Sequence, residues 1–318
     1  MRARGLLRTA AGAGLTVTVS ACAVLQHAAA PLPRPAPGLP ALARATLPAR
    51  TASYLGVFEP TSPQSYGQVS GFASEIGRSP NVVLYFSGWS VPFKTQFADQ
   101  AWANGAIPAI QMDPERISVA DIAAGRYDTY LRTYAVAVRS YGHPVIIGFG
   151  HEMNGWWFPW GYRHTTPAQF VAAWRHVVNV FRQQGAYNVT WLWTINIIDP
   201  AHGIRTPAAW WPGSSYVTWV GIDGYYRKPS WTFASLFGPT IKAVRTLTLD
   251  PIILAETGVA LAAGQPGKIT DLFTGVHAYG LLGFTWFDAN GSRDWRLASP
   301  AASAAFRRGA RTFGRLSS

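Results

Sequence analysis

Eight short apolar runs follow one another along the chain after Ala52, separated by amphipathic segments. Their residues are nearly continuous in hydrophobicity instead of alternating, which is typical of parallel strands that are covered on both faces. Eight strand–helix units in about 265 residues predict a (β/α)8 TIM barrel of the α/β class. The runs are YLGVF (54–58), NVVLYF (81–86), AIPAIQ (106–111), PVIIGF (144–149), VTWLWT (189–194), YVTWVGI (216–222), PIILAE (251–256) and LLGFTWF (281–287).

A doubly wound sheet is the competing α/β fold, and the residues after the first run argue against it. Such a sheet needs a glycine-rich phosphate loop after its first strand, whereas YLGVF is followed by EPTSPQSYG. Helical patterns between the runs fit the barrel. In TTPAQFVAAWRHVVNVFRQQG, Thr166 can cap the helix, Pro167 fits its first turn and Gly185 ends it. A second helix is predicted in PGKITDLFTGVHAYG, before the last run.

The N-terminus predicts export. Residues 1–30 begin with three arginines and continue with a short apolar segment rich in small residues, which is the layout of a signal peptide. The segment VSAC resembles a bacterial lipobox, in which Cys22 would be lipidated after cleavage; ordinary cleavage near 28–30 would remove that cysteine instead. Both alternatives predict a secreted or surface-anchored bacterial protein. Residues 31–51 are proline-rich and predict a linker, so the folded domain would span 52–318.

The net charge of +12 is concentrated in part near the N-terminus. Six arginines and no acid lie in the first fifty residues, which leaves 21 of the 27 basic residues and all 15 acidic residues for the rest. Those charges are scattered, with no basic run or basic helix face. They predict a solvated surface and not a nucleic-acid interface. Cys22 is the one cysteine, so no intramolecular disulfide can form.

Two of the five glutamates end apolar runs, and their positions predict an active site. Glu152 follows the fourth run, in GHEMNGWWFPWG, and Glu256 ends the seventh run, in LAETG. The active site of a (β/α)8 barrel lies at the carboxyl ends of its strands, and strands four and seven stand roughly across the mouth from each other. Two facing carboxylates suit cleavage of a glycosidic bond, since one protonates the leaving oxygen while the other attacks the anomeric carbon or activates water.

The neighbours of these glutamates predict different protonation states. Indoles beside Glu152 provide an apolar setting that raises a carboxyl pKa, whereas hydrogen bonds, with Tyr225 within reach, would keep Glu256 ionised. The alternative is that both are structural acids in salt bridges. Tryptophans in or beside the predicted loops suit stacking on sugar rings, with buried packing as their alternative. They are Trp156, Trp157, Trp160, Trp286 and Trp295.

Two other hydrolytic sites fit the chain poorly. HEMNG begins like the zinc-peptidase motif HExxH, but Gly155 stands where the second histidine must be. Asn154 and Gly155 would also break the helix that this motif requires. No GxSxG segment is present to supply a serine nucleophile. The motifs therefore favour carboxylate chemistry.

The segment GHEMNGWWFPWG resembles the acid/base segment of glycoside hydrolase family 26, which is best known for endo-β-1,4-mannanases. The ETG that begins at Glu256 resembles the nucleophile segment of the same family. The family belongs to a clan of retaining (β/α)8 enzymes, and the resemblance in layout runs from about Tyr54 to Arg308. It implies that Glu152 is the acid/base and Glu256 the nucleophile, and that the chemistry needs no metal or organic cofactor.

The resemblance also implies roles for neighbouring residues. His151 would contact the sugar at the cleavage subsite, Trp157 would line the leaving-group side, and Trp286 would be the platform beneath the bound sugar. Asp223 and Tyr225 match an Asp-x-Tyr pair whose tyrosine holds the nucleophile. The full predicted substrate-binding set is His151, Asn154, Trp157, Trp160, Asp223, Tyr225 and Trp286.

One departure from the family pattern bears on the substrate. Mannanases of the family usually carry an arginine four residues before the acid/base, where this chain has Gly148. We predict a retaining hydrolase of a β-linked polysaccharide, with mannan favoured and β-1,3-xylan, mixed-linkage β-glucan or a bacterial exopolysaccharide as alternatives. A carbohydrate-binding barrel without catalysis is the alternative from another class. The predicted partner is the polysaccharide; the chain is expected to be a monomer that binds no nucleic acid and meets a membrane only through a lipid at Cys22.

Overall fold

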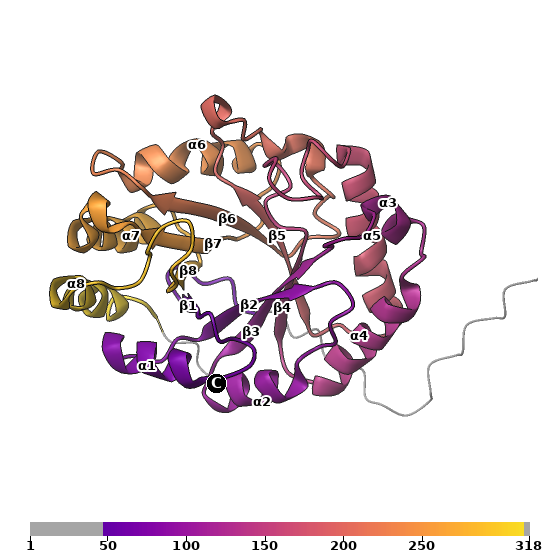
Figure 1. Cartoon of the computed structure of the whole chain (residues 1–318), viewed down its shortest axis with the longest axis horizontal. Helices are drawn as coiled ribbons and strands as arrows, with labels where there is room; N and C mark the ends of the chain where they lie inside the picture. The colour runs from indigo at the N-terminus through magenta and orange to yellow at the C-terminus, as the bar shows by residue number, and fades with distance from the viewer. Residues whose placement is uncertain (1–46, 315–318) are drawn as a thin grey trace, which may run out of the picture. The chain divides into compact units, whose positions relative to one another are not determined.

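Eight parallel strands close into a barrel in the computed structural model, which describes residues 47–314. Each strand pairs with its neighbours along the chain, and β8 pairs with β1, which confirms the predicted (β/α)8 fold (Figure 1). The predicted signal segment, Cys22 and most of the predicted linker lie outside the described residues. The strands are β1 (Tyr54–Phe58), β2 (Val82–Gly88), β3 (Ile107–Asp113), β4 (Val145–Phe149), β5 (Val189–Asn196), β6 (Trp219–Tyr226), β7 (Ile252–Val259) and β8 (Gly283–Phe287).

Helices surround the barrel and cover its outer face (Figure 1). They are α1 (Gly67–Ile76), α2 (Thr95–Ala103), α3 (Val119–Ala123), α4 (Asp128–Tyr141), α5 (Pro167–Gln183), α6 (Phe233–Arg245), α7 (Gln265–Ala278) and α8 (Pro300–Ala310). Both predicted helices are confirmed. Thr166 caps α5 by accepting a hydrogen bond from the N–H of Gln169, whose side chain reaches back to the Thr166 N–H. Within the described part of the chain, no helix has the length and apolarity needed to cross a bilayer.

Apolar side chains form one cluster between the barrel and the helices and a smaller one inside the barrel. Tyr54 of β1 and Trp219 of β6 belong to strands that are not neighbours, yet their rings meet edge-on with centroids 4.7 Å apart. Both residues lie at the beginning of their strands. The amino-terminal end of the barrel is therefore filled with large apolar rings, and the polar residues of the interior lie toward the other end.

The predicted boundaries of the sixth and seventh strands are wrong. β6 begins at Trp219, three residues after the predicted start, and it continues through Asp223 to Tyr226. β7 continues past Glu256 to Val259. The ladder between β6 and β7 continues past the paired acids Asp223 and Glu256 to Tyr226 and Val259. Both acids are buried, which is an uncommon placement for carboxylates.

Candidate active site

Polar side chains from five consecutive strands form one cluster at the carboxyl end of the barrel. Hydrogen bonds and charge interactions connect its members, and all of them are buried or half-buried. The two predicted glutamates therefore belong to one site. The cluster consists of Asp113 of β3, His151 and Glu152 after β4, Asn196 of β5, Asp223 and Tyr225 of β6, and Glu256 of β7.

The backbone of Glu152 is strained. Its φ of +55° lies in the left-handed region, which residues with a Cβ seldom occupy. Two hydrogen bonds hold it there: the N–H donates to the carbonyl of Thr194 on β5 (2.9 Å), and the carbonyl accepts from the N–H of Gly155 (2.8 Å). Backbone strain of this kind persists only where the surroundings fix it, and it often occurs at functional sites.

The side chain of Glu152 is fixed at both oxygens. Asn196 Nδ2 donates to Oε1 (2.5 Å) and the indole Nε1 of Trp157 donates to Oε2 (2.7 Å). Trp157 is half-buried, so it lies beside the carboxylate with part of its ring open to solvent. These contacts leave the carboxyl group little freedom to rotate.

Glu256 faces the barrel interior because β7 carries a β-bulge. Ile253 pairs with Gly221 and Glu256 with Asp223, so β7 contains one more residue than β6 over this stretch; the ladder with β8 shows the same extra residue. Ile253 and Ala255 belong to the inner apolar cluster. Strict alternation would therefore turn Glu256 outward, and the extra residue places it on the inner face.

Tyr225 orients the Glu256 carboxylate. Its hydroxyl donates to Oε2 (2.6 Å), and the Tyr225 ring is itself packed against Trp295 (centroids 4.5 Å apart). Oε1 of Glu256 is buried and has no hydrogen-bond partner in residues 47–314. One oxygen is thus held in place while the other remains free.

Burial governs the protonation of Glu256. Burial raises the pKa of this carboxyl to about 7. The positive charge of His151 and the hydrogen bond from Tyr225 lower the pKa, whereas the negative charge of Glu152 raises it further. Removal from water outweighs the hydrogen bond from Tyr225, so this hydrogen bond favours the ionised form of Glu256 but does not return its pKa to the usual range.

His151 brings a positive charge to the site. Burial would lower the pKa of this imidazole, but the charge and hydrogen bond of Asp113, whose Oδ1 lies 2.9 Å from Nδ1, raise the pKa to about 9. Asp113 is a site residue that the sequence analysis did not identify. The feature that could have identified Asp113 is its position as an acid at the end of the apolar strand β3.

Asp223 lies between the other polar groups in the ladder, opposite Asn196 on one side and Glu256 on the other. It has no exposed surface, and its carboxyl group interacts with the backbone of Glu256 and the side chain of Glu152. Burial, followed by the charges of Glu256 and Glu152, raises its pKa well above the usual range. The raised pKa favours the neutral form of Asp223.

The predicted platform Trp286 is wrong. Its side chain has no exposed surface and packs edge-on against Phe306 of α8, with centroids 5.4 Å apart. Side chains alternate along β8, so Phe287 is the aromatic residue that reaches the mouth. Its half-buried ring stacks on Phe58 (4.4 Å between centroids) and meets Tyr225 edge-on (5.9 Å).

Asn154 and Trp160, also predicted to bind substrate, support the turn instead. Asn154 is fully buried; its Nδ2 donates to the carbonyls of Asn196 and Arg205, and its Oδ1 accepts from the N–H of Asn196. Trp160 is 1% exposed, and its indole donates to the carbonyl of His151 (2.7 Å). Neither side chain presents a surface to a ligand, so both predictions are corrected to structural roles.

Gly148 is the position at which family mannanases usually carry an arginine. A Cβ at this position would clash with Oε1 of Gln111 on β3, whose Nε2 donates to Thr194 Oγ1 on β5. Gln111 is fully buried. The space of the missing side chain is therefore already filled, and an arginine at 148 would require Gln111 to move.

The chemistry of the cluster is that of carboxylic acids. Residues 47–314 contain no group of three or more histidine, cysteine or acidic side chains arranged to hold a metal ion. Two fixed carboxyl groups in one buried, partly charged site suit general acid/base and nucleophilic catalysis on a glycosidic bond. A (β/α)8 barrel with this pair at its carboxyl end has the architecture of a glycoside hydrolase.

Comparisons with known proteins give the family. Residues 95–255 match the model of glycosyl hydrolase family 26. The chain is 32% identical over 270 residues to Endoglucanase H of Acetivibrio thermocellus, a match that covers 80% of this chain and 30% of that protein. The chain therefore belongs to glycosyl hydrolase family 26. It spans less than a third of the length of Endoglucanase H.

Solved structures agree on the fold. The YdhT protein from Bacillus subtilis superimposes with a TM-score of 0.64 at 18% identity, covering 83% of this chain and 88% of that one. A family 26 β-mannanase from Bacteroides ovatus superimposes with a TM-score of 0.61 at 17% identity, and the match covers 86% of this chain and 92% of that one. At these identities the likeness establishes the barrel and not its substrate.

Proposed function

We propose that the protein is a retaining endo-hydrolase of β-linked glucan, with Glu256 as the nucleophile and Glu152 as the acid/base. The observation that carries this proposal is the pairing of two buried glutamates, each fixed by its own hydrogen bonds, within one electrostatically coupled site. Retention requires the two carboxyl groups to stand ~5–5.5 Å apart. Family membership supports the same chemistry.

The reaction has two steps. The free oxygen of Glu256 attacks the anomeric carbon while Glu152 gives its proton to the departing glycosidic oxygen, which produces a glycosyl-enzyme ester and a shortened glycan. Glu152, now ionised, removes a proton from water as the water attacks that ester. The second step restores both carboxyl groups and releases a sugar with its original anomeric configuration.

Neighbouring residues set the charge balance of this reaction. Tyr225 orients the nucleophile, and the cation of His151 stabilises its ionised form. Burial favours the neutral form of Asp223, and in that form it adds no negative charge that would oppose ionisation of Glu256. Trp157 donates to Glu152 and offers its ring beside the position of the leaving group.

Two observations favour glucan over the mannan that the sequence first suggested. The space beside Gly148 is filled by Gln111, so the site lacks room for the arginine of family mannanases. The relative that matches most of the chain at 32% identity is an endoglucanase.

Incubation with lichenan, galactomannan and β-1,3-xylan tests the substrate. New reducing ends should appear fastest from lichenan, and NMR of the first product should show the β-anomer. Cleavage of galactomannan alone would restore the mannanase assignment. Retention on an affinity gel without any new reducing ends would favour a binding protein.

Asp113→Asn should move the acidic limb of the pH profile to higher pH. In the wild type, kcat/KM should rise as the pH increases through about 7, since Glu256 must be ionised to attack. The variant removes the partner that keeps His151 protonated, and a neutral His151 no longer lowers the pKa of Glu256. The variant also removes the repulsion between Asp113 and Glu256, which by itself would lower the pKa of Glu256. Loss of the His151 charge is the larger effect, so the pKa of Glu256 rises and the acidic limb moves to higher pH.

Measurement of kcat/KM from pH 5 to 9 on lichenan checks this prediction. Asp99→Asn, which removes an exposed carboxylate from α2, should leave the limb in place. A limb that moves to lower pH in Asp113→Asn would show that His151 does not govern the nucleophile.

We also propose that the enzyme acts outside the cell as a monomer whose partner is the polysaccharide, either secreted or held at the surface by a lipid on Cys22. The signal-like layout of residues 1–30 supports export. Mass spectrometry of the mature N-terminus distinguishes a diacylated Cys22 from cleavage near residue 30.

A further inference from the structure

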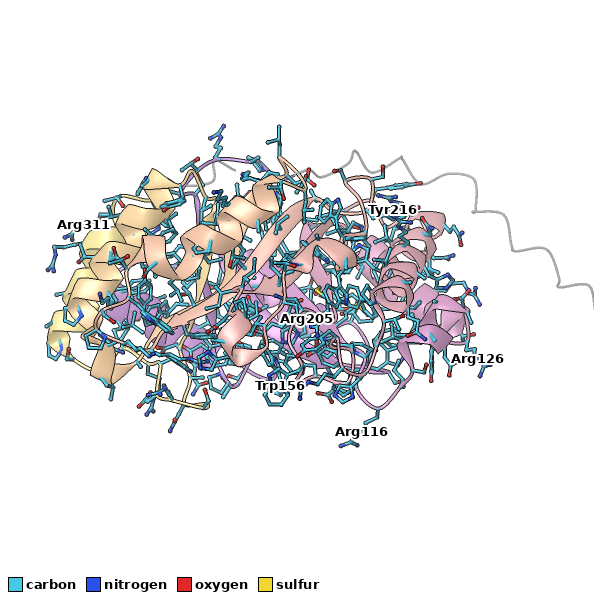
Figure 2. All side chains as sticks on the ribbon, turned by 90° about the horizontal axis from the view of Figure 1, so that it is seen from above. Arg116, Arg126, Trp156, Arg205, Tyr216 and Arg311 are labelled. Atoms are coloured by element: carbon cyan, nitrogen blue, oxygen red, sulfur yellow. The ribbon has the colours of Figure 1, made fainter. Side chains whose placement is uncertain are left out.

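Aromatic and basic side chains form an exposed patch on the loops after β4 and β5. We call Trp156, Tyr162, Arg163 and Arg205 the β4–β5 patch. Trp156 is 42% exposed, and its ring meets that of Trp157 edge-on with centroids 6.1 Å apart. Figure 2 shows Trp156 and Arg205 near each other on the lower side of the molecule. Because Trp157 binds Glu152, the patch begins one indole away from the proposed acid/base.

Two guanidinium groups converge on a single phenol in this patch. The Cζ of Arg205 lies 4.3 Å from the centroid of the Tyr162 ring, and that of Arg163 lies 5.9 Å from it and 5.2 Å from the Trp156 ring. Although partial burial opposes the change, hydrogen bonds and charges from both arginines lower the pKa of Tyr162. Both arginines therefore stand close to the same hydroxyl.

Neither arginine has an acidic partner. Among the ion pairs of residues 47–314, none involves Arg163 or Arg205. The acid of the β5 loop, Asp199, is already paired with His202 at 2.7 Å. Two neighbouring cations without a counter-charge repel each other, and a bound anion would relieve that repulsion. The planar fork of a guanidinium matches a carboxylate, which it can bind through two parallel hydrogen bonds.

Other loops at the carboxyl ends of the strands also carry unpaired cations. In the described chain, no ion pair involves four of the basic residues on the loops after β3, β6 and β8. Two of them also lie over tryptophan rings. The acid Asp294 on the β8 loop is neutralised by Arg296 (2.7 Å). The cations are Arg116, Arg227, Lys228 and Arg293.

We propose that the bound glycan carries carboxylates, and that Arg163 and Arg205 bind the carboxylate of an acidic sugar unit on the leaving-group side. Trp156 stacks on a ring of the same chain. A neutral glycan would fill this region and leave both guanidiniums without a counter-ion. Placement of the acidic sugar unit on the leaving-group side rests on the proposed function, whereas binding of its carboxylate by Arg163 and Arg205 does not.

Affinity electrophoresis tests the proposal through binding alone. Gels contain lichenan or carboxymethyl-lichenan, and every variant also carries Glu152→Gln so that the polymer is not cut. The protein should be retarded more by the carboxymethyl polymer than by lichenan. Arg163→Gln with Arg205→Gln should weaken binding to the carboxymethyl polymer by about tenfold or more, because hydrogen bonds between charged groups are lost, while retardation by lichenan stays unchanged.

A charge-matched control separates a site from general attraction. Arg308→Gln with Arg311→Gln also removes two exposed positive charges, but at the end of α8, where Figure 2 shows Arg311 far from Trp156. This pair should change binding by less than about twofold. Equal losses in the two double variants, or no loss in either, would overturn the proposal. Absence of hydrolysis in the wild type would refute the proposed reaction and leave this result intact.

Discussion

Glu256→Ala will abolish hydrolysis of polysaccharide and of aryl glycosides alike. Removal of a covalent nucleophile costs on the order of 10⁴- to 10⁶-fold in kcat, and a better leaving group cannot compensate because it does not replace the attacking oxygen. The carboxylate of Glu256 accepts one side-chain hydrogen bond, from Tyr225, and its other oxygen has no hydrogen-bond partner in the described chain, so its removal disturbs few contacts. The loss should therefore appear in kcat with the barrel still folded.

External formate supplies the decisive measurement for Glu256. The alanine leaves a gap next to Tyr225, and a small anion that enters it can attack the anomeric carbon of an activated β-glycoside or assist water. Recovery of turnover with formate would place the missing carboxylate at the reacting carbon. Glu115→Ala, which removes an exposed carboxylate after β3, should keep full activity. Residual wild-type activity in Glu256→Ala without any anion would contradict the assignment.

The sequence predicts the barrel because each strand is a continuous apolar run and each connection has helix signals. It also predicts both glutamates, since an acid at the end of such a run is an uncommon feature. It does not predict that β7 bulges before Glu256. The bulge depends on the register with two neighbouring strands, which local residue patterns do not contain.

The tryptophans show why binding residues are harder to predict than catalytic ones. Trp156, Trp157 and Trp160 lie within five residues, yet they are exposed, half-buried and buried in turn. Which ring faces solvent depends on the fold of one tight turn around the strained Glu152. Resemblance to the family predicts that Trp286 lies in the mouth, but alternation along β8 turns it toward α8.

Glu152→Ala will separate the two steps of the reaction. On lichenan, the loss of general acid catalysis should lower kcat by about 10²- to 10⁴-fold. On a 2,4-dinitrophenyl β-cellotrioside, whose leaving group needs no proton, formation of the glycosyl-enzyme should remain fast. Hydrolysis of that ester should then be slow, because Glu152 also activates the water in the proposed mechanism.

A burst of dinitrophenol followed by slow turnover is the expected signature, with KM lowered because the intermediate accumulates. Mass spectrometry of the quenched protein should find the glycosyl group esterified to Glu256. Trp157→Phe, which removes only the N–H that donates to Glu152 Oε2, should show a smaller loss on lichenan and no burst. Equal losses of activity on lichenan and on the dinitrophenyl glycoside in Glu152→Ala would show that Glu152 does not transfer a proton. A residue that only shapes the site would affect both substrates alike, whatever the basicity of their leaving groups.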